Sequence, residues 1–369
     1  MKIRAAVLHA PGEPFRIEIL DLADPAAGEV RVRVKAAGVC HSDWHLVTGD
    51  TQHPFPLVAG HEGCGVVEAV GEGVASVRVG DFVALNWAPS CGTCFHCALG
   101  RPALCATYVE PIWAGTMIDG TTRLSRGGKP VYHYSALACF AEACVVPEGC
   151  CVALPASTPP SVAALIGCAV TTGVGSVLNT ARVPKGASVV VLGAGGVGLS
   201  TVLGAALAGA HPIVAVDVHR AKEGPALACG ATQFLLDGPD LPERVRALTD
   251  GRGADYVFEA VGIPSLQERC LDLVRSGGTV VLSGLSPMGS ATNLPGSVLV
   301  RREIAVLGSY YGTCVAARDF PLYARHCQEG RLPLERLVSR TYSLEQINEA
   351  YADMLSGEGA RGVILFEGS

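Results

Sequence analysis

Charge and aromatic side chains are both scarce in this sequence. Charged residues make up 17% and aromatic residues 6% of the 369 residues, and the net charge is −6 because Asp and Glu (34) outnumber Lys and Arg (28). A chain without a basic surplus lacks the electrostatic signature of a nucleic-acid-binding protein. We therefore expect no polyanionic partner.

Long apolar runs are also missing. The chain reaches a turn at Pro11-Gly12 after too few apolar residues for a signal-peptide core, and no run of 18 or more apolar residues follows. These two absences predict a cytoplasmic protein that does not enter a membrane. A length of 369 residues exceeds the roughly 250–300 that one hydrophobic core supports, so two domains are expected, one of which can be discontinuous.

The first third of the chain has the pattern of a β domain. Residues 29–35 alternate apolar and charged side chains with a period of two, which predicts a half-buried antiparallel strand. Further short strands at 65–71 and 80–85 are separated by Gly and Pro. This punctuation is typical of a barrel-like β domain.

From Ala187 onward the pattern changes to alternating strands and helices. A strand at 188–192, a glycine turn, helical residues and a strand at 212–216 predict the start of a doubly wound parallel sheet, an α/β fold. Further strands are expected at 256–259, 279–282 and 304–307. Near the end, a capped helix over 343–355 would bury Leu344, Ile347, Tyr351 and Leu355 on one face, and a strand at 362–366 would return to the first domain.

The glycine turn has the form of a dinucleotide site. Gly193, Gly195 and Gly198 form G-x-G-x-x-G between a strand and a helix, which allows a tight turn and lets the backbone approach a pyrophosphate. Asp217 ends the next strand, where a carboxylate binds ribose hydroxyls and repels a 2′-phosphate. We expect NAD rather than NADP, with Arg220 leaving the strictness of that choice open.

Cysteine is abundant, with 15 residues, and four of them follow C-x2-C-x2-C-x7-C. Four thiolates on one loop can close around a tetrahedral ion and leave no open position, which predicts a structural zinc site. The alternatives are an iron–sulfur cluster or an exposed group of free thiols. The four residues are Cys91, Cys94, Cys97 and Cys105.

A second set of metal-ligand residue types is dispersed along the chain. It comprises Cys40, His61 with Glu62, and Cys168. Each of these alone is more typical of a core residue than of a ligand. Gly60-His-Glu62 is followed by Gly65, Gly71 and Val74, which is the pattern G-H-E-x2-G-x5-G-x2-V.

With this motif the chain resembles zinc-containing medium-chain alcohol dehydrogenases over essentially its whole length. The resemblance implies a GroES-like β-barrel catalytic domain at 1–169, a Rossmann NAD-binding domain at 170–310 and a return to the first domain at 311–369. It also implies two zinc ions per chain: the structural zinc, and a catalytic zinc held by Cys40, His61 and Cys168 with a fourth position for water or alcohol. The active site would lie between the two domains.

The resemblance further assigns roles in the reaction. Zinc would act as a Lewis acid on the alcohol, whose hydride passes to NAD. A proton relay would run through Ser42, the nicotinamide ribose and His45, while Asp43 orients His61 and Glu62 serves as a transient extra ligand. The remaining coenzyme contacts would be the Gly193–Gly198 turn, including Gly196. Thr172 and Val197 would lie beside the nicotinamide, Lys222 at the adenosine ribose, Arg361 at the pyrophosphate, and His41 also at the coenzyme. Because His41 stands where several relatives carry Arg, coenzyme release would be faster and more pH-dependent.

The sequence is compatible with more than one class of substrate. The resemblance places Thr51, Trp87, Val109, Glu110, Tyr134 and Tyr310 around the pocket, where their rings suit a primary, aromatic or medium-length alcohol or simply fill the core. Leu85-Asn-Trp87, Gly100-Arg-Pro102, Tyr311-Gly312 and Arg331-Leu-Pro333 resemble mycothiol-dependent formaldehyde dehydrogenases, so an S-(hydroxymethyl)mycothiol adduct is the alternative substrate. A glutathione adduct is disfavoured because Thr51 and Val109 replace the residues that hold glutathione in such relatives.

Two further expectations concern relatives and assembly. A zinc-free quinone reductase or a noncatalytic relative would share the fold, but retention of both ligand sets argues against it. The length of segment 106–142 is similar to that of dimeric members, so we expect a homodimer. Residues 304–307 are the candidate edge strand for its pairing.

Overall fold

The computed structural model describes residues 1–357 and 359–366. Its N-terminal part begins with a closed barrel of short strands in the order β1-β2-β7-β8-β4. The core at the barrel contains buried side chains such as Leu8, Leu20 and Phe140. Its strands are β1 (Lys2–Leu8), β2 (Arg16–Leu22), β4 (Leu57–Val58), β7 (Leu124–Arg126) and β8 (Lys129–His133).

A seven-stranded sheet packs beside the barrel in the order β10-β6-β5-β3-β18-β17, with β9 also paired to β3. The alternating segment predicted at 29–35 forms β3, which is antiparallel to β5, as expected. Residues 361–365 form β18, which pairs with β3 through Ile364 and Ala37 and confirms that the chain end returns to this sheet. The strands are β3 (Glu29–Gly38), β5 (Gly63–Val70), β6 (Phe82–Leu85), β9 (Ala143–Pro147), β10 (Cys151–Ala153), β17 (Val338–Tyr342) and β18 (Arg361–Leu365).

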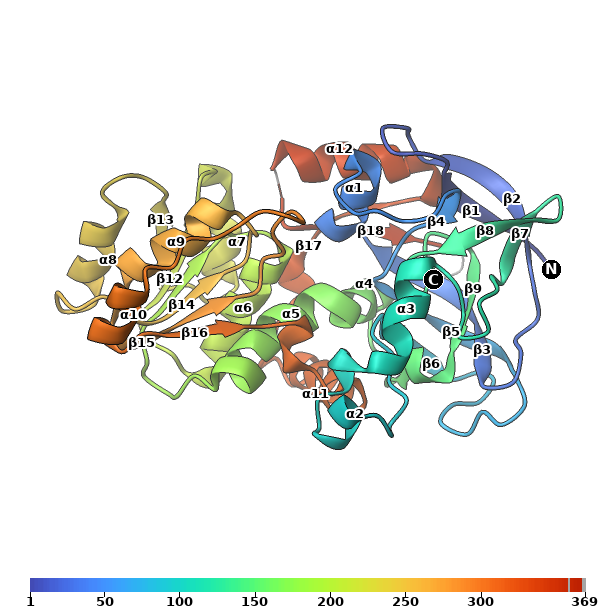
Figure 1. The fold of residues 1–369 in the computed structure, drawn as a ribbon, viewed down its shortest axis with the longest axis horizontal. Helices are drawn as coiled ribbons and strands as arrows, with labels where there is room; N and C mark the ends of the chain where they lie inside the picture. Colours follow the sequence, from blue (N-terminus) through green and yellow to red (C-terminus); the bar gives the residue numbers. More distant parts are fainter. Residues whose placement is uncertain (358, 367–369) are drawn as a thin grey trace.

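The predicted doubly wound sheet is confirmed in the middle of the chain. Six parallel strands lie in the order β13-β12-β11-β14-β15-β16, so the first strand, β11, is central and the chain winds outward to both sides. Figure 1 shows this part on the left, with helices on both faces. The strands are β11 (Val189–Leu192), β12 (Ile213–Asp217), β13 (Gln233–Leu236), β14 (Ala254–Glu259), β15 (Val274–Leu282) and β16 (Ala305–Gly308); the helices are α6 (Gly196–Ala208), α7 (Glu223–Ala228), α8 (Leu241–Leu248), α9 (Pro264–Leu273) and α10 (Gly296–Arg302).

One helical stretch, Pro160–Ala181, lies between the two parts (Figure 1). It is built from α4 (Pro160–Leu165), the π-helical segment η3 (Ile166–Val170), α5 (Thr171–Gly175) and the π-helical segment η4 (Ser176–Ala181). Within the described residues it is the one helix long and apolar enough to cross a membrane, yet 89% of its most apolar window is buried, which is the position of a core helix. Sequence reading missed it because Gly, Ser and Thr interrupt its apolar residues.

The C-terminal helix confirms its predicted cap and corrects its predicted face. Ser343 and Gln346 form the reciprocal capping box at the start of η8 (Leu344–Gln346), which leads into α12 (Ile347–Ser356). Leu344, Ile347 and Tyr351 are buried, but Leu355, in the last turn of α12, is 47% exposed, so the buried face does not extend to this turn. The remaining helices are α1 (His41–Thr48), α2 (Phe95–Ala98), α3 (Ala106–Ala114) and α11 (Ala316–Gln328), with 3-10 turns η1 (Pro102–Leu104), η2 (Glu148–Cys150), η5 (Arg220–Lys222), η6 (Tyr311–Thr313) and η7 (Leu334–Leu337).

Candidate active site

The dispersed ligand candidates come together in the structure. Cys40 stands just before α1, His61 and Glu62 lie just before β5, and Cys168 lies in the π-helical segment η3. All four side chains are buried, and their ligand atoms lie within 4.8 Å of one another. Chain segments far apart in sequence therefore converge on one point.

The imidazole of His61 is held by a carboxylate. Its Nδ1 lies 3.0 Å from Oδ2 of Asp43, although the approach is off the N–H axis, while Oδ1 of Asp43 accepts the Gly60 amide at 2.8 Å. Asp43 is fully buried. Fixing Nδ1 in this way leaves Nε2 of His61 for a metal, which is the usual arrangement of a metal-binding histidine.

The donor set fits zinc. Two thiols and one imidazole in a buried pocket are ligands that zinc accepts in a tetrahedral site. A hydrogen bond with Cys168 and the neighbouring His61 and Arg361 hold the pKa of the Cys40 thiol well below its usual range, despite burial, so this thiol is prepared to bind a cation.

Glu62, the fourth member of the cluster, forms an ion pair with Arg361. An ion pair joins the two side chains, which are 0% and 7% exposed, although Oε1 of Glu62 and Nε of Arg361 have no partner within the described part of the chain. Burial raises the pKa of Glu62 to about 8, even though the charge of Arg361 opposes this shift. The role of Glu62 as a transient metal ligand stays a prediction, and the unpartnered Oε1 is the atom that it would use.

Arg361 also contacts the glycine turn. A Cβ atom on Gly196 would lie 2.4 Å from Cδ of Arg361 and 2.8 Å from Nη1, so this arginine packs directly on the backbone at the start of α6. The residue predicted for the pyrophosphate therefore bridges the turn and the carboxylate of Glu62. Sequence analysis did not foresee this ion pair.

The glycine turn has the tight geometry that was expected. Gly193 has φ +94°, and a Cβ on Gly198 would lie 1.8 Å from the Gly193 carbonyl oxygen. A Cβ on Gly195 would meet no atom within 4 Å, so the backbone there faces open space. This is the position at which a pyrophosphate approaches in such turns.

Several predicted coenzyme residues line one cavity at this turn. The cavity is bordered by His41, Gly195, Gly196, Lys222 and Arg361, together with Ser339, Tyr342 and Gly359, which the sequence did not single out. Burial lowers the pKa values of both His41 and Lys222. Lys222 donates to the Gly359 carbonyl, which fixes its ammonium at the edge of the cavity.

Asp217 is fixed at the end of β12. Its Oδ2 accepts the Ala194 amide at 2.8 Å, and its Oδ1 accepts the His219 amide at 2.9 Å. The carboxylate therefore stands beside the glycine turn in a set orientation.

Thr172 and Val197, both expected near the nicotinamide, lie on helices in close contact. A Cβ on Gly173, next to Thr172, would be 2.5 Å from the carbonyl oxygen of Val197. The packing of α5 on α6 therefore brings these two residues, which are distant in sequence, close together.

The two proton-relay candidates lie on the same short helix, α1. Oγ of Ser42 is 3.8 Å from Sγ of Cys40, so this hydroxyl is beside the metal-ligand cluster. Nδ1 of His45 lies 3.3 Å from Oδ2 of Asp50, a half-exposed carboxylate that also accepts the Thr48 hydroxyl at 2.6 Å. His45 thus faces the surface while Ser42 faces the site.

Two of the predicted pocket residues form an aromatic wall against His61. The Tyr134 ring is 5.6 Å and the Trp87 ring 6.5 Å from the imidazole, both edge-on. Trp87 packs in turn on Tyr310, at 5.4 Å, and on Tyr311, at 4.5 Å. Tyr311 is the member of this wall that sequence reasoning missed as a site residue, and its adjacent position to Tyr310 was the available signal.

The other pocket candidates lie further out. Val109 is 51% exposed on α3, and Glu110 next to it is also exposed. The Thr51 amide donates to the His45 carbonyl at 3.0 Å, which places Thr51 in the loop after α1.

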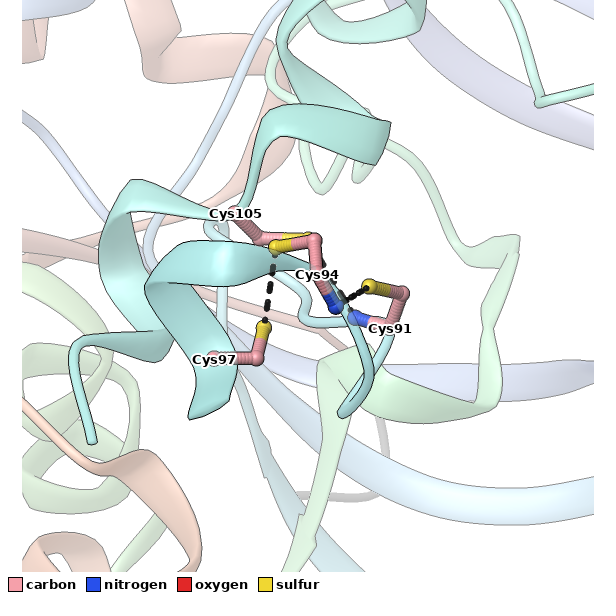
Figure 2. Close-up of side chains that lie close together, drawn as sticks. All are labelled: Cys91, Cys94, Cys97 and Cys105. Carbon is pink, nitrogen blue, oxygen red and sulfur yellow. Dashed lines mark hydrogen bonds between the residues drawn. The ribbon is translucent and has the colours of Figure 1, made fainter. Parts of the chain in front are cut away.

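The four closely spaced cysteines form the second metal-ligand group (Figure 2). Sγ of Cys94 is 3.5 Å from Sγ of Cys97 and 3.8 Å from Sγ of Cys105. Zn–S bonds of about 2.3 Å at tetrahedral angles require sulfur–sulfur distances of about 3.8 Å, so the set fits zinc. The Cys94 amide donates to the Cys91 sulfur and the Cys91 amide to the Cys105 sulfur, both at 3.3 Å, which favours thiolates.

Comparison with known proteins identifies relatives along the whole chain. Residues 26–156 match the alcohol dehydrogenase GroES-like domain, and residues 196–329 match the zinc-binding dehydrogenase family. The chain is 40% identical over 371 residues to the NDMA-dependent alcohol dehydrogenase of Amycolatopsis methanolica, covering 99% of each chain. It is 38% identical over 370 residues to an S-(hydroxymethyl)glutathione dehydrogenase of Escherichia coli O139:H28, covering 99% of this chain and 100% of that one.

Solved structures agree. An alcohol dehydrogenase zinc-binding domain protein from Burkholderia ambifaria superposes with a TM-score of 0.95 at 35% identity, and the benzyl alcohol dehydrogenase of Acinetobacter calcoaceticus with 0.94 at 30%; each comparison covers 99% of both chains. A buried Cys2His set beside a dinucleotide-type sheet defines a zinc-dependent oxidoreductase acting on alcohols. The chain belongs to the zinc-containing medium-chain alcohol dehydrogenase family, which confirms the predicted family, fold class and enzyme class.

Proposed function

We propose that the protein oxidises a primary or aromatic alcohol to the aldehyde with NAD as the hydride acceptor, in a reversible reaction. The observation that carries this proposal is the convergence of Cys40, His61 and Cys168 within 4.8 Å, in a site that Arg361 connects to the glycine turn. When bound, zinc supplies Lewis acidity toward the alcohol oxygen and NAD supplies the hydride acceptor. The chain's own residues bind, orient and move the proton.

Ser42 and His45 would carry the alcohol proton to solvent. The Ser42 hydroxyl stands beside Cys40, where it can accept a hydrogen bond from an alcohol at the open ligand position. His45 has the Asp50 carboxylate as a surface partner and can pass a proton outward. Asp43 holds the His61 ring, and Trp87 and Tyr134 exclude water from its side of the site.

NAD is proposed over NADP because of Asp217. Its carboxylate is held by backbone amides beside the glycine turn, where it would accept ribose hydroxyls and repel a 2′-phosphate. We expect kcat/KM with NAD to exceed kcat/KM with NADP. The substitution Asp217→Ala should reduce the ratio of these two values. A wild-type preference for NADP would contradict this assignment.

The aromatic wall supports an alcohol with a ring or a medium-length chain. Trp87, Tyr134 and Tyr310 offer ring edges and faces to a substrate beside His61. The benzyl alcohol dehydrogenase with a TM-score of 0.94 is consistent with this choice. We therefore rank benzylic and medium-length primary alcohols above ethanol.

The test is NADH formation at 340 nm with the purified, zinc-replete protein and a panel of alcohols. Cys40→Ala should abolish turnover, whereas Cys270→Ser, a buried cysteine in α9 far from the ligand set in sequence, should retain it. If both variants kept their turnover, or if both lost it, Cys40 would have no specific role in the reaction. The assays are repeated with NDMA, because a 40%-identical relative depends on it; turnover only with NDMA would indicate that the coenzyme stays bound.

A thiol adduct of formaldehyde is the second candidate substrate. It is favoured by the 38% identity to an S-(hydroxymethyl)glutathione dehydrogenase and by the exposed outer position of Val109 and Glu110, which leaves room for a large adduct. The same assay is run with formaldehyde alone, with glutathione and with mycothiol. Activity confined to formaldehyde plus mycothiol would replace the free-alcohol proposal.

We also propose a homodimer, paired through β16. This strand, Ala305–Gly308, is the edge of the six-stranded sheet, and its residues are partly or fully exposed. An unpaired apolar edge is a surface that proteins usually cover. Size-exclusion chromatography with light scattering should give twice the chain mass, and a tetramer or monomer would contradict the proposal. The cytoplasmic location stays a prediction.

A further inference from the structure

The turn after β16 has an unusual backbone. Tyr311, Gly312 and Thr313 have φ values of 52°, 63° and 52°, so consecutive residues lie in the left-handed region. For a residue other than glycine, this region costs about 1–2 kcal/mol. Side-chain and backbone contacts must therefore hold this turn, which is η6, in place.

The contacts that hold η6 come from the helix that carries Cys168. A Cβ on Gly312 would lie 2.2 Å from the Thr171 carbonyl oxygen and 2.8 Å from Cα of Gly175, so the two backbones are in direct contact. Asn179 donates to the Gly312 carbonyl at 3.2 Å, and the Thr180 hydroxyl is 2.7 Å from that of Thr313. The turn is fastened along one side of the Pro160–Ala181 helix.

Tyr311 connects this turn to the segment that carries the ligand Cys168. Its ring is 3% exposed and packs on Trp87, and its hydroxyl donates to the carbonyl of Gly167, the residue before Cys168. On its other side Gly167 is confined by β6, because a Cβ there would lie 2.6 Å from the Leu85 carbonyl oxygen. Gly167 is thus held between Tyr311 and the end of β6.

The geometry of the helix at Gly167 explains why this hydrogen bond can affect Cys168. Cys168 lies in a π-helical segment, a turn that is wider than that of an α-helix, rare, and frequent at functional sites. A carbonyl in such a turn can take a side-chain donor. The orientation of the peptide between Gly167 and Cys168 then depends on that donor.

We propose that Tyr311 is a positioning residue for the ligand Cys168: its hydroxyl fixes the Gly167 carbonyl and so sets the direction from which the Cys168 sulfur enters the site. Tyr311 thereby also connects β16, the last strand of the six-stranded sheet, to the metal ligands. This inference rests on the proposed zinc site. It does not depend on which alcohol or coenzyme the protein uses.

The test is Tyr311→Phe, which keeps the ring against Trp87 and removes only the hydroxyl. Zinc transfer to a chelator is followed in the full-length protein, together with the absorption spectrum of the cobalt-substituted protein. We expect zinc release in two phases. The phase for the Cys40–His61–Cys168 site should become about tenfold faster, the effect typical of losing an outer partner of a ligand, and the phase for the four-cysteine site should be unchanged. The cobalt spectrum should shift.

The matched control is Tyr351→Phe. Tyr351 is equally buried, at 1% exposed, and its hydroxyl has no hydrogen-bond partner among the described residues, so its loss should leave both phases and the spectrum as in the wild type. Wild-type release and spectrum in Tyr311→Phe, or equal acceleration of both phases, would overturn the proposal. Because these readouts need no substrate, a failure of alcohol oxidation is distinguishable from a failure of this inference.

If Tyr311→Phe does not accumulate in folded form, Thr180→Val tests the same contact. It removes the hydroxyl that holds Thr313 and, at 2.9 Å, Ser309, and so loosens η6 without changing Tyr311. The same phase of zinc release should become faster by a smaller factor. No change in that phase would refute the role of the turn.

Discussion

A substitution of Gly195 by alanine should raise the stability of the fold and at the same time weaken coenzyme binding. Its φ and ψ of −80° and −169° are accessible to alanine, and a Cβ there would meet no protein atom within 4 Å. Gly195→Ala should therefore stabilise the folded chain by about 0.4–1 kcal/mol, because it restricts the unfolded backbone. For a chain of 369 residues that corresponds to a Tm increase of about 0.5–1.3 °C.

The same methyl group would occupy the space where the pyrophosphate is expected. Displacing the phosphate from one backbone amide removes a charge-assisted hydrogen bond worth about 1.5–3 kcal/mol, which weakens NAD binding about tenfold to a hundredfold. The Kd is measured by calorimetry and the Tm by differential scanning fluorimetry, both on the zinc-replete protein. The expected result is a higher Tm with a weaker Kd.

Gly296→Ala provides the control for this substitution. Gly296 begins α10, outside the cavity, and a Cβ there would also meet nothing within 4 Å. Its Tm should rise similarly while the Kd for NAD stays at the wild-type value. A Kd for Gly195→Ala within twofold of the wild type would refute the placement of the pyrophosphate, and a Tm several degrees lower would refute the open space at Gly195.

Three further substitutions test the rest of the site and the fold. Asp43→Asn removes the charge facing His61 and should weaken zinc binding there about 10- to 100-fold in chelator competition; an unchanged affinity would contradict this positioning role. His133→Gln keeps an acceptor for the Arg123 amide, which His133 Nε2 accepts at 2.9 Å. Because burial lowers the pKa of His133 to about 4, the unfolded chain protonates first, and the wild type should lose about 2 kcal/mol of stability relative to this variant between pH 7 and pH 5; parallel Tm curves would argue against it. Cys97→Ser should reduce bound zinc from two ions to one and lower the Tm, and full zinc content would show that the four-sulfur site does not hold metal.

Local patterns in the sequence predicted local structure well. The four cysteines of the zinc lobe lie on one short segment, so their spacing alone indicates a closed site. The glycine turn likewise appears between a strand and a helix in the sequence itself, and the structure places it between β11 and α6. Alternation over residues 29–35 identified β3 because one face of that strand is buried and the other is not.

Contacts between distant residues were beyond the reach of such patterns. Glu62 and Arg361 are 299 positions apart, and no periodicity connects them. The set of Cys40, His61 and Cys168 was assigned by resemblance because its members come from separate segments. The left-handed turn at Tyr311 also has no sequence signature, since a tyrosine adopts that conformation only when tertiary contacts stabilise it.

The order of synthesis gives the Pro160–Ala181 helix a particular role. When the ribosome has made this helix, α6, which covers one side of it, has not yet been translated. The first sheet is likewise incomplete until β18 pairs with β3, almost at the last residue. A nascent chain therefore exposes an apolar helix until α6 and its sheet have formed, and an open edge of β3 until β18 is made. The seven-stranded sheet cannot be completed before β18 has been made, so a chain truncated before β18 should be a substrate for chaperones and proteases rather than a smaller stable protein.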